Sequence, residues 1–178
     1  MKDTFVILVD KNDTQIGLME KMEAHRKALL HRAISVFIIN TRGEWILQKR
    51  AHDKYHSRGL WTNTCCTHPL PGESEEETAT RRLFEEMGLN CNLQKLFSFI
   101  YKEKLDDELT EYEYDHVFVG ITDSEPVINT SEVADWKKIS FKDLHFDITE
   151  NPDNYTFWFK EIYRNVNDHM LNERKSAL

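Results

Sequence analysis

The stretch between Ser74 and Gly88 carries signals for a helix at both of its ends. Ser74 and Glu77 have the spacing of a capping box, in which a hydroxyl and a carboxylate satisfy free amides of the first turn. The apolar positions that follow recur every four residues and predict one buried stripe: Ala79, Leu83 and Met87. Gly88 is the residue type at which such helices commonly end. An amphipathic helix gains most of its stability from packing, so the chain must also supply a layer for it to cover.

That layer is predicted to be a β-sheet. Runs of strand length and composition occupy residues 4–9, 16–22, 33–40, 45–50, 61–68 and 93–102. Residues 41–43, Thr-Arg-Gly, predict a hairpin turn between two of them. A further pair of strands, 101–105 and 111–121, flanks an acidic turn at 106–108.

A second helix is predicted near the C-terminus, over about residues 155–173. Its apolar positions have helical spacing: Phe159, Ile162, Tyr163, Val166 and Met170. The first helix is expected over about 73–89. Strands, a helix, more strands and a final helix predict a mixed α/β (α+β) fold. No linker or repeat interrupts the chain, and we expect one domain over residues 1–178.

Charge and cysteine content narrow the class of protein. The net charge of −8 disfavours nucleic acid, whose phosphates require a basic face, whereas a small phosphorylated substrate needs only a local cationic pocket. No apolar run approaches the ~18 residues of a membrane helix, and the run after residue 4 is too short for a secretory signal. Three cysteines, two of them adjacent, do not form a disulfide framework. We expect a cytoplasmic protein without a nucleic-acid or membrane partner, as a monomer or a homodimer.

The segment from Trp61 to Pro69 contains the adjacent cysteines. On an extended chain Cys66 and His68 share one face, while Cys65 points to the other and is assigned to the core. A thiol beside a metal-binding imidazole is a plausible acid–base group, because nearby positive charge lowers its pKa. A free cysteine is as often a small buried hydrophobe, and these residues alone leave both interpretations of Cys66 open.

Carboxylates and imidazoles form a possible metal-binding set. Glu111 and Glu113 fall on one face of a strand, where a cation would relieve their repulsion, although a solvated acidic edge strand has the same pattern. With His25, His31 and His68 they make a nitrogen and oxygen donor set suited to Mn²⁺, Zn²⁺ or Mg²⁺. The other histidines are expected to be surface or capping residues: His52, His56, His116, His145 and His169.

The first helix resembles the Nudix box, Gly-x5-Glu-x7-Arg-Glu-(aliphatic)-x-Glu-Glu-x-Gly-(aliphatic). The matching positions are Glu73, Arg81, Leu83, Glu85, Glu86, Gly88 and Leu89. Thr67 replaces the opening glycine, and Arg82 replaces the glutamate of the Arg-Glu pair. In pyrophosphohydrolases of this fold that part of the helix helps collect metal ions. The resemblance therefore implies a Nudix fold, whereas the charge reversal at Arg82 counts against hydrolysis.

Type I isopentenyl-diphosphate isomerases are the branch of this fold that the chain resembles. The resemblance covers most of the chain and rests on separated motifs: Glu20-Lys21, Leu30-His31-Arg32-Ala33, Gln48-Lys49-Arg50, residues 62–69, the modified box, Glu111-x-Glu113 and Phe157-Trp158-Phe159. It implies an isomerase of isoprenoid biosynthesis that interconverts isopentenyl diphosphate and dimethylallyl diphosphate.

The same resemblance implies a role for each matching residue. One divalent ion, Mn²⁺, Zn²⁺ or Mg²⁺, would be bound by His25, His31, His68, Glu111 and Glu113. Glu86 and the diphosphate would hold a Mg²⁺ ion. Lys21, Arg50 and Lys54 would bind the diphosphate, with Arg82 as a plausible addition. Cys66 and Glu113 would be the catalytic pair, and Tyr101 and Trp158 would line the hydrocarbon end.

Such a reaction adds a proton to an alkene and removes another from a neighbouring carbon, so it needs a donor and an acceptor. The sequence leaves open which of Cys66 and Glu113 is the acid; we favour Glu113 with Tyr101 as acid and Cys66 as base. Trp158 would stabilise a carbocation by about 0.5–2 kcal/mol.

Two alternatives make different predictions. A Nudix pyrophosphohydrolase acting on nucleoside diphosphate derivatives would release phosphate or a mononucleotide. A non-enzymatic binding module would tolerate Cys66→Ala without loss of function.

Overall fold

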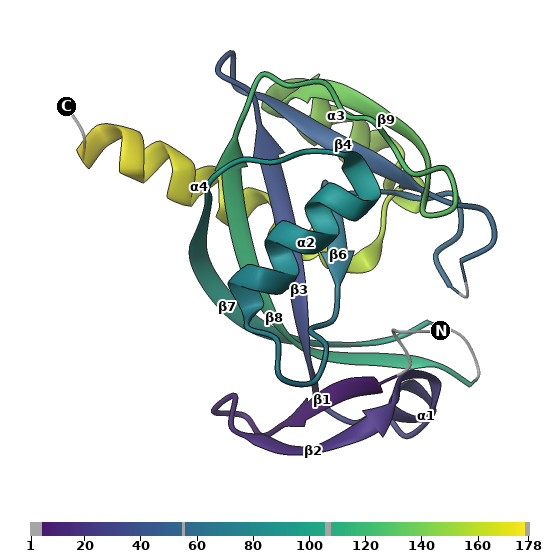
Figure 1. Ribbon diagram of the computed structural model, residues 1–178. Helices are drawn as coiled ribbons and strands as arrows, with labels where there is room; N and C mark the ends of the chain where they lie inside the picture. Colours follow the sequence, from purple (N-terminus) through teal and green to yellow (C-terminus); the bar gives the residue numbers. More distant parts are fainter. Residues whose placement is uncertain (1–4, 55, 106–107, 177–178) are drawn as a thin grey trace.

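The computed structural model describes residues 5–54, 56–105 and 108–176. In this part of the chain nine strands form one curled, mixed sheet (Figure 1). Its main path runs from β2 (Gln15–Glu20) through β1 (Phe5–Val9), β3 (His31–Ile39) and β4 (Glu44–Arg50) to β5 (Trp61–Thr62). Off this path lie β6 (Cys65–Thr67) and β8 (Thr110–Ile121), which pair with β3, β7 (Leu93–Lys104) beside β8, and β9 (Val133–Ser140) beside β4. The predicted mixed α/β class is confirmed.

Helices cover both faces of this sheet. They are α1 (Lys21–Arg26), α2 (Glu75–Met87), α3 (Phe141–Glu150), a 3-10 turn (Pro152–Asn154) and α4 (Phe157–Ser176). In Figure 1, α2 crosses one side of the sheet and α4 extends from the other toward the C-terminus. None of the helices in the described segments is long and apolar enough to cross a membrane.

The central strand β3 separates two hydrophobic cores because its side chains alternate between the faces of the sheet. Ile34, Val36 and Ile38 pack with the apolar stripe of α2. Phe37 and Ile39 pack on the opposite face with α3 and α4. Each predicted amphipathic helix therefore covers its own face of the sheet.

The end signals of the first helix are confirmed. Ser74 and Glu77 form the capping box, and the helix ends at Gly88, whose φ of 64° is left-handed. All three residues of the predicted stripe are buried. The five apolar positions predicted for the C-terminal helix are buried as well, although α4 begins two residues after the expected start because Tyr155 is still extended, bridging to Trp61.

Several predicted strands differ from the observed ones. Residues 21–22 belong to α1, because the Glu20 carboxylate accepts hydrogen bonds from the amides of Met22 and Glu23 and so begins a helix. Residues 61–68 form two short strands, β5 and β6, instead of one. Neither β9 nor α3 was among the predicted elements. The sequence of β9 has little apolar alternation, and this strand is held by its backbone pairing with β4. Residue 4 and the acidic residues 106–107 lie outside the described residues.

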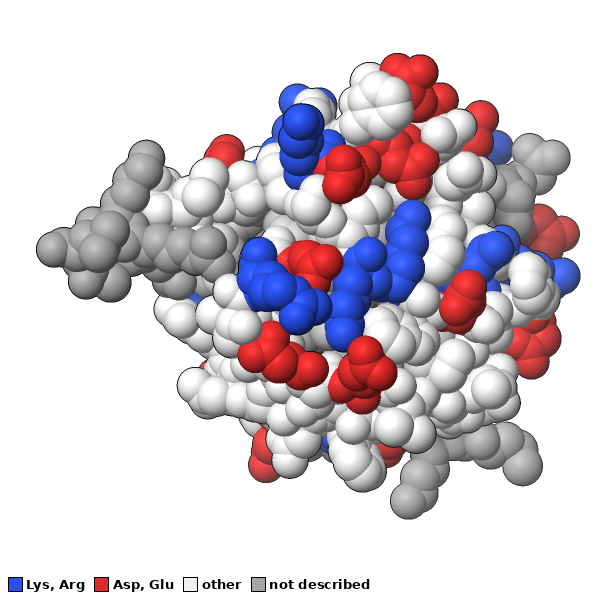
Figure 2. All heavy atoms as spheres, turned by 90° about the horizontal axis from the view of Figure 1, so that it is seen from above, with Lys and Arg blue, Asp and Glu red and all other residues white. Residues whose placement is uncertain are grey.

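Charged side chains are mixed on the face seen from above in Figure 2. Lysine and arginine side chains gather near its centre, and aspartate and glutamate side chains lie among and around them. Basic and acidic groups therefore neutralise one another locally on this face.

Candidate active site

A single cavity brings together residues from most of the chain. Its walls include residues of β3, β6 and β8. Residues of β1, β4, β7, α1, α2 and α4 and of the connecting segments complete them. The lining residues are Phe5, Lys21, Ile34, Ser35, Arg50, Lys54, His56, Cys66, Thr67, His68, Leu70, Arg82, Tyr101, Glu111, Glu113, Glu132 and Trp158. All eight residues predicted to bind substrate or to be catalytic are among them. Of the predicted metal ligands, His68, Glu111 and Glu113 line the cavity, whereas His25, His31 and Glu86 are buried and are not among the lining residues.

Three histidines and one glutamate form a compact donor group. The ligand atoms of His25, His31, His68 and Glu113 all lie within 4.8 Å of one another. The parallel pairing of β3 with β8 places His31 beside Glu113, and their Nε2 and Oε1 atoms are 3.5 Å apart. The Nε2 atom of His68 lies 2.9 Å from the same Oε1 atom. Sheet register therefore builds this group from distant parts of the sequence.

Backbone carbonyls orient two of these rings through Nδ1, so that Nε2 is the atom left for the donor group. The Nδ1 atoms of His25 and His31 are 2.7 and 2.9 Å from the backbone carbonyls of Lys21 and Leu29. A carbonyl oxygen only accepts, so each Nδ1 carries the proton and donates it. Burial and the nearby His31 lower the pKa of His25 to about 4, and burial lowers that of His68 to about 3, which keeps both rings neutral at pH 7. Buried imidazoles beside a carboxylate, two of them oriented by backbone carbonyls, fit a divalent metal ion.

His56 and Glu111 form a second donor group with His25. The His56 Nε2 atom lies 3.0 Å from the Glu111 Oε1 atom, and the ring meets Trp158 edge-on at 5.9 Å between centroids. The expectation that His56 is a surface or capping residue is therefore wrong, because it is buried in the cavity wall. It reaches this position because the segment after β4 folds back, with the Arg50 Nη2 atom donating to the His56 carbonyl at 3.3 Å. No local spacing signals this contact.

His116 is also buried, contrary to expectation, but lies outside the cavity lining. Its Nε2 atom is 3.0 Å from a carboxylate oxygen of Asp13, and its Nδ1 atom is 2.9 Å from the Ser98 hydroxyl. Arg32 binds Asp13 as well, at 2.8 Å. These contacts attach the β1–β2 turn to the rest of the sheet.

Tyr101 bridges the two glutamates of β8. Its hydroxyl donates to Glu113 at 2.7 Å and lies 3.2 Å from Glu111. Burial and the charge of Glu113 raise the pKa of Glu111 to about 8. Although burial acts in the same direction on Glu113, the imidazoles of His31 and His68 hold its pKa well below the usual value. The pKa values of these two neighbouring glutamates are therefore shifted in opposite directions.

The Cys66 thiol is enclosed by polar partners from two elements. Its S–H group donates to the Asn63 Oδ1 atom at 3.0 Å, and the indole N–H of Trp158 donates to its sulfur at 3.1 Å. Burial raises the pKa of Cys66 to about 12, so the thiol is protonated at neutral pH. Cys65 packs in the opposite core, beneath α2, as predicted. Asn63 was absent from the predicted residues, since a buried amide gives no distinctive sequence pattern.

The cationic residues collect at another part of the cavity. Lys21, Arg50, Lys54 and Arg82 all line it. Burial lowers the pKa of Lys21 to about 8, against the attraction of Glu113. Arg82 donates to Glu86 at 2.6 Å, and the Gln48 amide donates to the other Glu86 oxygen at 3.0 Å. Several positive groups and one buried carboxylate suit an anionic, metal-complexed ligand.

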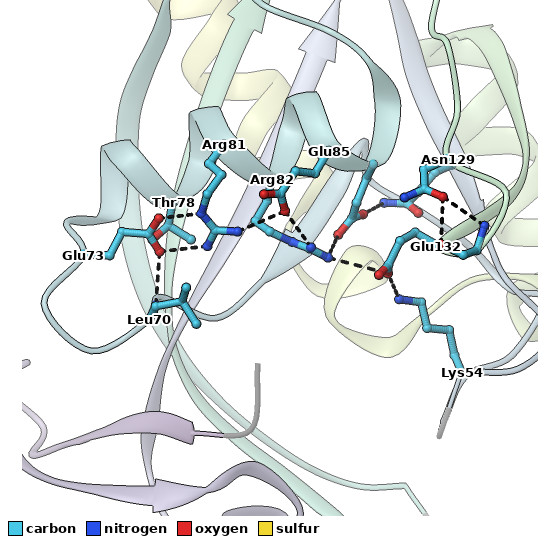
Figure 3. A network of polar contacts seen from close by, with 12 residues as sticks. Lys54, Leu70, Glu73, Thr78, Arg81, Arg82, Glu85, Asn129 and Glu132 are labelled. Carbon is cyan, nitrogen blue, oxygen red and sulfur yellow. Dashed lines mark hydrogen bonds and ion pairs between the residues drawn. The ribbon is translucent and has the colours of Figure 1, made fainter. Parts of the chain in front are cut away.

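A chain of ion pairs runs along α2 toward this cationic region (Figure 3). The Arg81 guanidinium binds Glu73 at 2.6 Å and Glu85 at 3.0 Å, and Arg82 binds Glu85 at 2.9 Å. Hydrogen bonds from Arg81 lower the pKa of Glu73 to about 2. Arg82, which departs from the Nudix box, thus connects the box to the cavity.

Comparison with known proteins shows both a family and a fold. The NUDIX domain family profile matches residues 29–162. Isopentenyl-diphosphate Delta-isomerase 2 of Photorhabdus laumondii subsp. laumondii is 50% identical, over 96% of this chain and 97% of its own. Isopentenyl-diphosphate Delta-isomerase of Pectobacterium atrosepticum is 47% identical over 93% of both chains, and Isopentenyl-diphosphate Delta-isomerase 1 of Aromatoleum aromaticum is 52% identical over 87% and 88%.

Solved structures resemble this chain at low sequence identity. DR0079 from Deinococcus radiodurans has a TM-score of 0.74 at 18% identity, covering 90% of this chain and 98% of its own. The NUDIX domain of Shewanella oneidensis NrtR, complexed with ADP ribose, has a TM-score of 0.62 at 16% identity over 85% and 99%. Such identities establish the fold alone, and the predicted Nudix fold is confirmed.

Proposed function

Since the chain belongs to the isopentenyl-diphosphate Delta-isomerase family and carries a NUDIX domain, we propose that its cavity interconverts isopentenyl diphosphate and dimethylallyl diphosphate. The family predicted from the sequence motifs is thereby confirmed, and the chain is an enzyme of this type. The reaction moves a double bond by adding a proton at one carbon and removing one from a neighbouring carbon.

The observation that carries the proposed mechanism is the position of Cys66 and Glu113 on strands that flank β3. Cys66 of β6 is in register with Ser35, and Glu113 of β8 is in register with His31. Residues in register project to the same face of a sheet. A thiol and a carboxylate thus face one cavity from either side of β3, as a proton donor and an acceptor must.

The protonation of the substrate-free protein supports roles for this pair. Cys66 holds a proton because burial raises its pKa to about 12, whereas the pKa of Glu113 is held well below its usual value. We therefore assign Cys66 as the proton donor and Glu113 as the acceptor for isopentenyl diphosphate, and the opposite roles in the reverse direction. This proposal differs from the assignment favoured from the sequence, in which Glu113 with Tyr101 is the acid and Cys66 is the base.

Tyr101 and Trp158 support the hydrocarbon end in this proposal. The Tyr101 hydroxyl, 2.7 Å from Glu113, stabilises the carboxylate as a hydrogen-bond donor. Trp158 is buried in the cavity wall, where its indole face attracts positive charge by about 0.5–2 kcal/mol. A dry aromatic wall also protects a carbocation from capture by water.

In this proposal one group of polar residues binds a metal ion and another binds the diphosphate. A divalent ion, Mn²⁺, Zn²⁺ or Mg²⁺, held by His25, His31, His68, Glu111 and Glu113, would supply the positive charge that keeps both carboxylates ionised. Lys21, Arg50, Lys54 and Arg82 would bind the diphosphate, and Glu86 would hold Mg²⁺ together with it. The buried position of Glu86 between Arg82 and Gln48 supports this assignment.

The test is to incubate the protein with Mg²⁺ and isopentenyl diphosphate in deuterated water and to follow the substrate by proton NMR. Dimethylallyl signals should grow, with deuterium entering the new methyl group. Cys66→Ala and Glu113→Gln should each lower the rate by at least about 100-fold, the lower range for a lost acid or base. Cys91→Ala should keep wild-type activity, because Cys91 does not line the cavity.

Two outcomes would contradict the proposal. An unchanged spectrum from metal-loaded protein would exclude isomerisation. Release of phosphate from nucleoside diphosphate derivatives, without dimethylallyl product, would favour the pyrophosphohydrolase alternative instead.

A further inference from the structure

Glu132 places a negative charge among the cations of the cavity. Its carboxylate forms an ion pair with Lys54 and lies 3.5 Å from the Arg82 Nη2 atom. Figure 3 shows Glu132 between these two residues, at the end of the ion-pair chain from α2. Two of the four cationic side chains in the lining are thus already bound to an anion of the protein itself.

The backbone holds Glu132 in this position from both sides. Its carbonyl accepts from the Ala51 amide at 3.1 Å, which ties it to the segment that carries Lys54. Three residues earlier, the Asn129 amide donates to the Glu86 carbonyl at 2.8 Å, which ties the same loop to α2. The Asn129 side chain also accepts from the amide and hydroxyl of Ser131. These hydrogen bonds therefore fix the loop in a position where the Glu132 carboxylate contacts Lys54 and Arg82.

We propose that Glu132 is a built-in counter-anion, which the substrate's diphosphate displaces from Lys54 and Arg82 and which thereby limits the affinity of the site for diphosphates. This rests on the proposed function, because it requires the diphosphate to bind at these cations. In the substrate-free site Glu132 keeps the two cations paired and in place. On binding, the diphosphate takes over both cations and meets the repulsion of the Glu132 carboxylate.

The reaction explains why a carboxylate that competes with the diphosphate would be useful. Substrate and product carry the same diphosphate, and a contact to it that is equally strong in the ground state and the transition state lowers KM without raising kcat. Excess affinity at this end would instead retain the product and any other diphosphate anion. A competing carboxylate limits that affinity while the cations stay ordered. Glu132 thus sets how strongly the site holds a diphosphate group.

The experiment compares wild-type protein with Glu132→Gln, which keeps the shape of the side chain and removes its charge. Binding of inorganic pyrophosphate is measured by titration calorimetry, with and without Mg²⁺. We expect the variant to bind pyrophosphate about tenfold more tightly in both conditions, as losing one competing charged pair implies. In steady-state kinetics its KM for isopentenyl diphosphate should fall, whereas kcat should not rise.

Glu125→Gln is the matched control, since Glu125 lies in the same β8–β9 connection but is exposed and pairs with Lys138 at 3.1 Å. It should bind pyrophosphate as the wild type does. Unchanged or weaker binding by Glu132→Gln, with an unchanged unfolding midpoint, would overturn the proposal. Weakening confined to Mg²⁺ would also overturn it, and would make Glu132 a metal ligand instead. If wild-type protein bound neither pyrophosphate nor isopentenyl diphosphate, the proposed function itself would fail.

Discussion

At the scale of single residues, Cys65 and Cys66 illustrate how much one step along a strand decides. Cys65 packs beneath α2, and Cys66 turns to the cavity, where Trp158 donates to its sulfur. Alternation along a strand makes this division predictable. The hydrogen bond from Cys66 to Asn63 depends instead on how the turn between β5 and β6 folds, and only the structure reveals it.

His56 is expected to orient Glu111 for metal binding. Its Nε2 atom lies 3.0 Å from the Glu111 Oε1 atom, and loss of a residue that orients a metal ligand typically weakens metal binding by about 10–100-fold. Titration of metal-free His56→Ala with Zn²⁺ should show a loss in that range. His52→Ala, an exposed position in the same segment, should bind as the wild type does. Equal affinities for both variants would rule out this role.

At the scale of elements, α2 connects the sheet to the cavity. Its apolar stripe packs on β3, and its polar side carries Arg82 and Glu86. Its C-terminal end also holds the β8–β9 loop, since the amides of Val127 and Asn129 donate to Met87 and Glu86 carbonyls. The end of this helix therefore positions the loop that carries Glu132.

Gly88→Ala should destabilise the protein more than Gly43→Ala. Both glycines have positive φ, 64° and 83°, so each substitution adds left-handed strain of about 1–2 kcal/mol. A Cβ atom at Gly88 would also meet the Val127 carbonyl oxygen at 2.7 Å, whereas nothing lies within 4 Å of one at Gly43. Denaturant unfolding should show the larger loss of unfolding free energy for Gly88→Ala. Equal losses would mean that the β8–β9 loop moves aside without cost.

At the scale of the whole molecule, the cavity gathers ionisable groups whose protonation differs between the folded and unfolded states. Burial lowers the pKa of His25 to about 4 and of His68 to about 3, so these residues reduce stability as pH falls below about 6.5. Burial and Glu113 raise the pKa of Glu111 to about 8 from 4.5, so Glu111 acts in the opposite direction. In the absence of metal, the two histidines therefore lower the unfolding free energy as pH falls, and Glu111 lowers it as pH rises.

Glu111→Gln isolates one of these contributions. In the wild type, the unfolded chain releases the Glu111 proton near pH 4.5 and the folded protein near pH 8, so the unfolding free energy falls as pH rises between them. The limiting slope is about 1.4 kcal/mol per pH unit. The change in unfolding free energy from pH 5 to pH 8, measured in chelator, should be more positive for the variant than for the wild type, since both keep the contributions of His25 and His68. Parallel pH profiles would contradict the raised pKa.

The sequence by itself determined the features that depend on neighbouring residues. The capping box and terminal glycine defined α2, alternation defined the faces of Cys65, Cys66 and the β8 glutamates, and the ordered motifs identified the family. It did not predict α1, β9 or α3. The helix α1 is too short to give a clear periodic pattern, and β9 is stabilised by pairing with β4.

Only the tertiary structure decided which residues meet. His56 and Glu132 resemble ordinary polar residues of connecting segments, and both reach the cavity because those segments fold back over the sheet. The protonation of Cys66, Glu111 and Glu113 was likewise outside what the sequence could predict, because burial and partner distance shift a pKa. Sequence patterns record local geometry, whereas contacts between distant segments depend on the path of the whole chain.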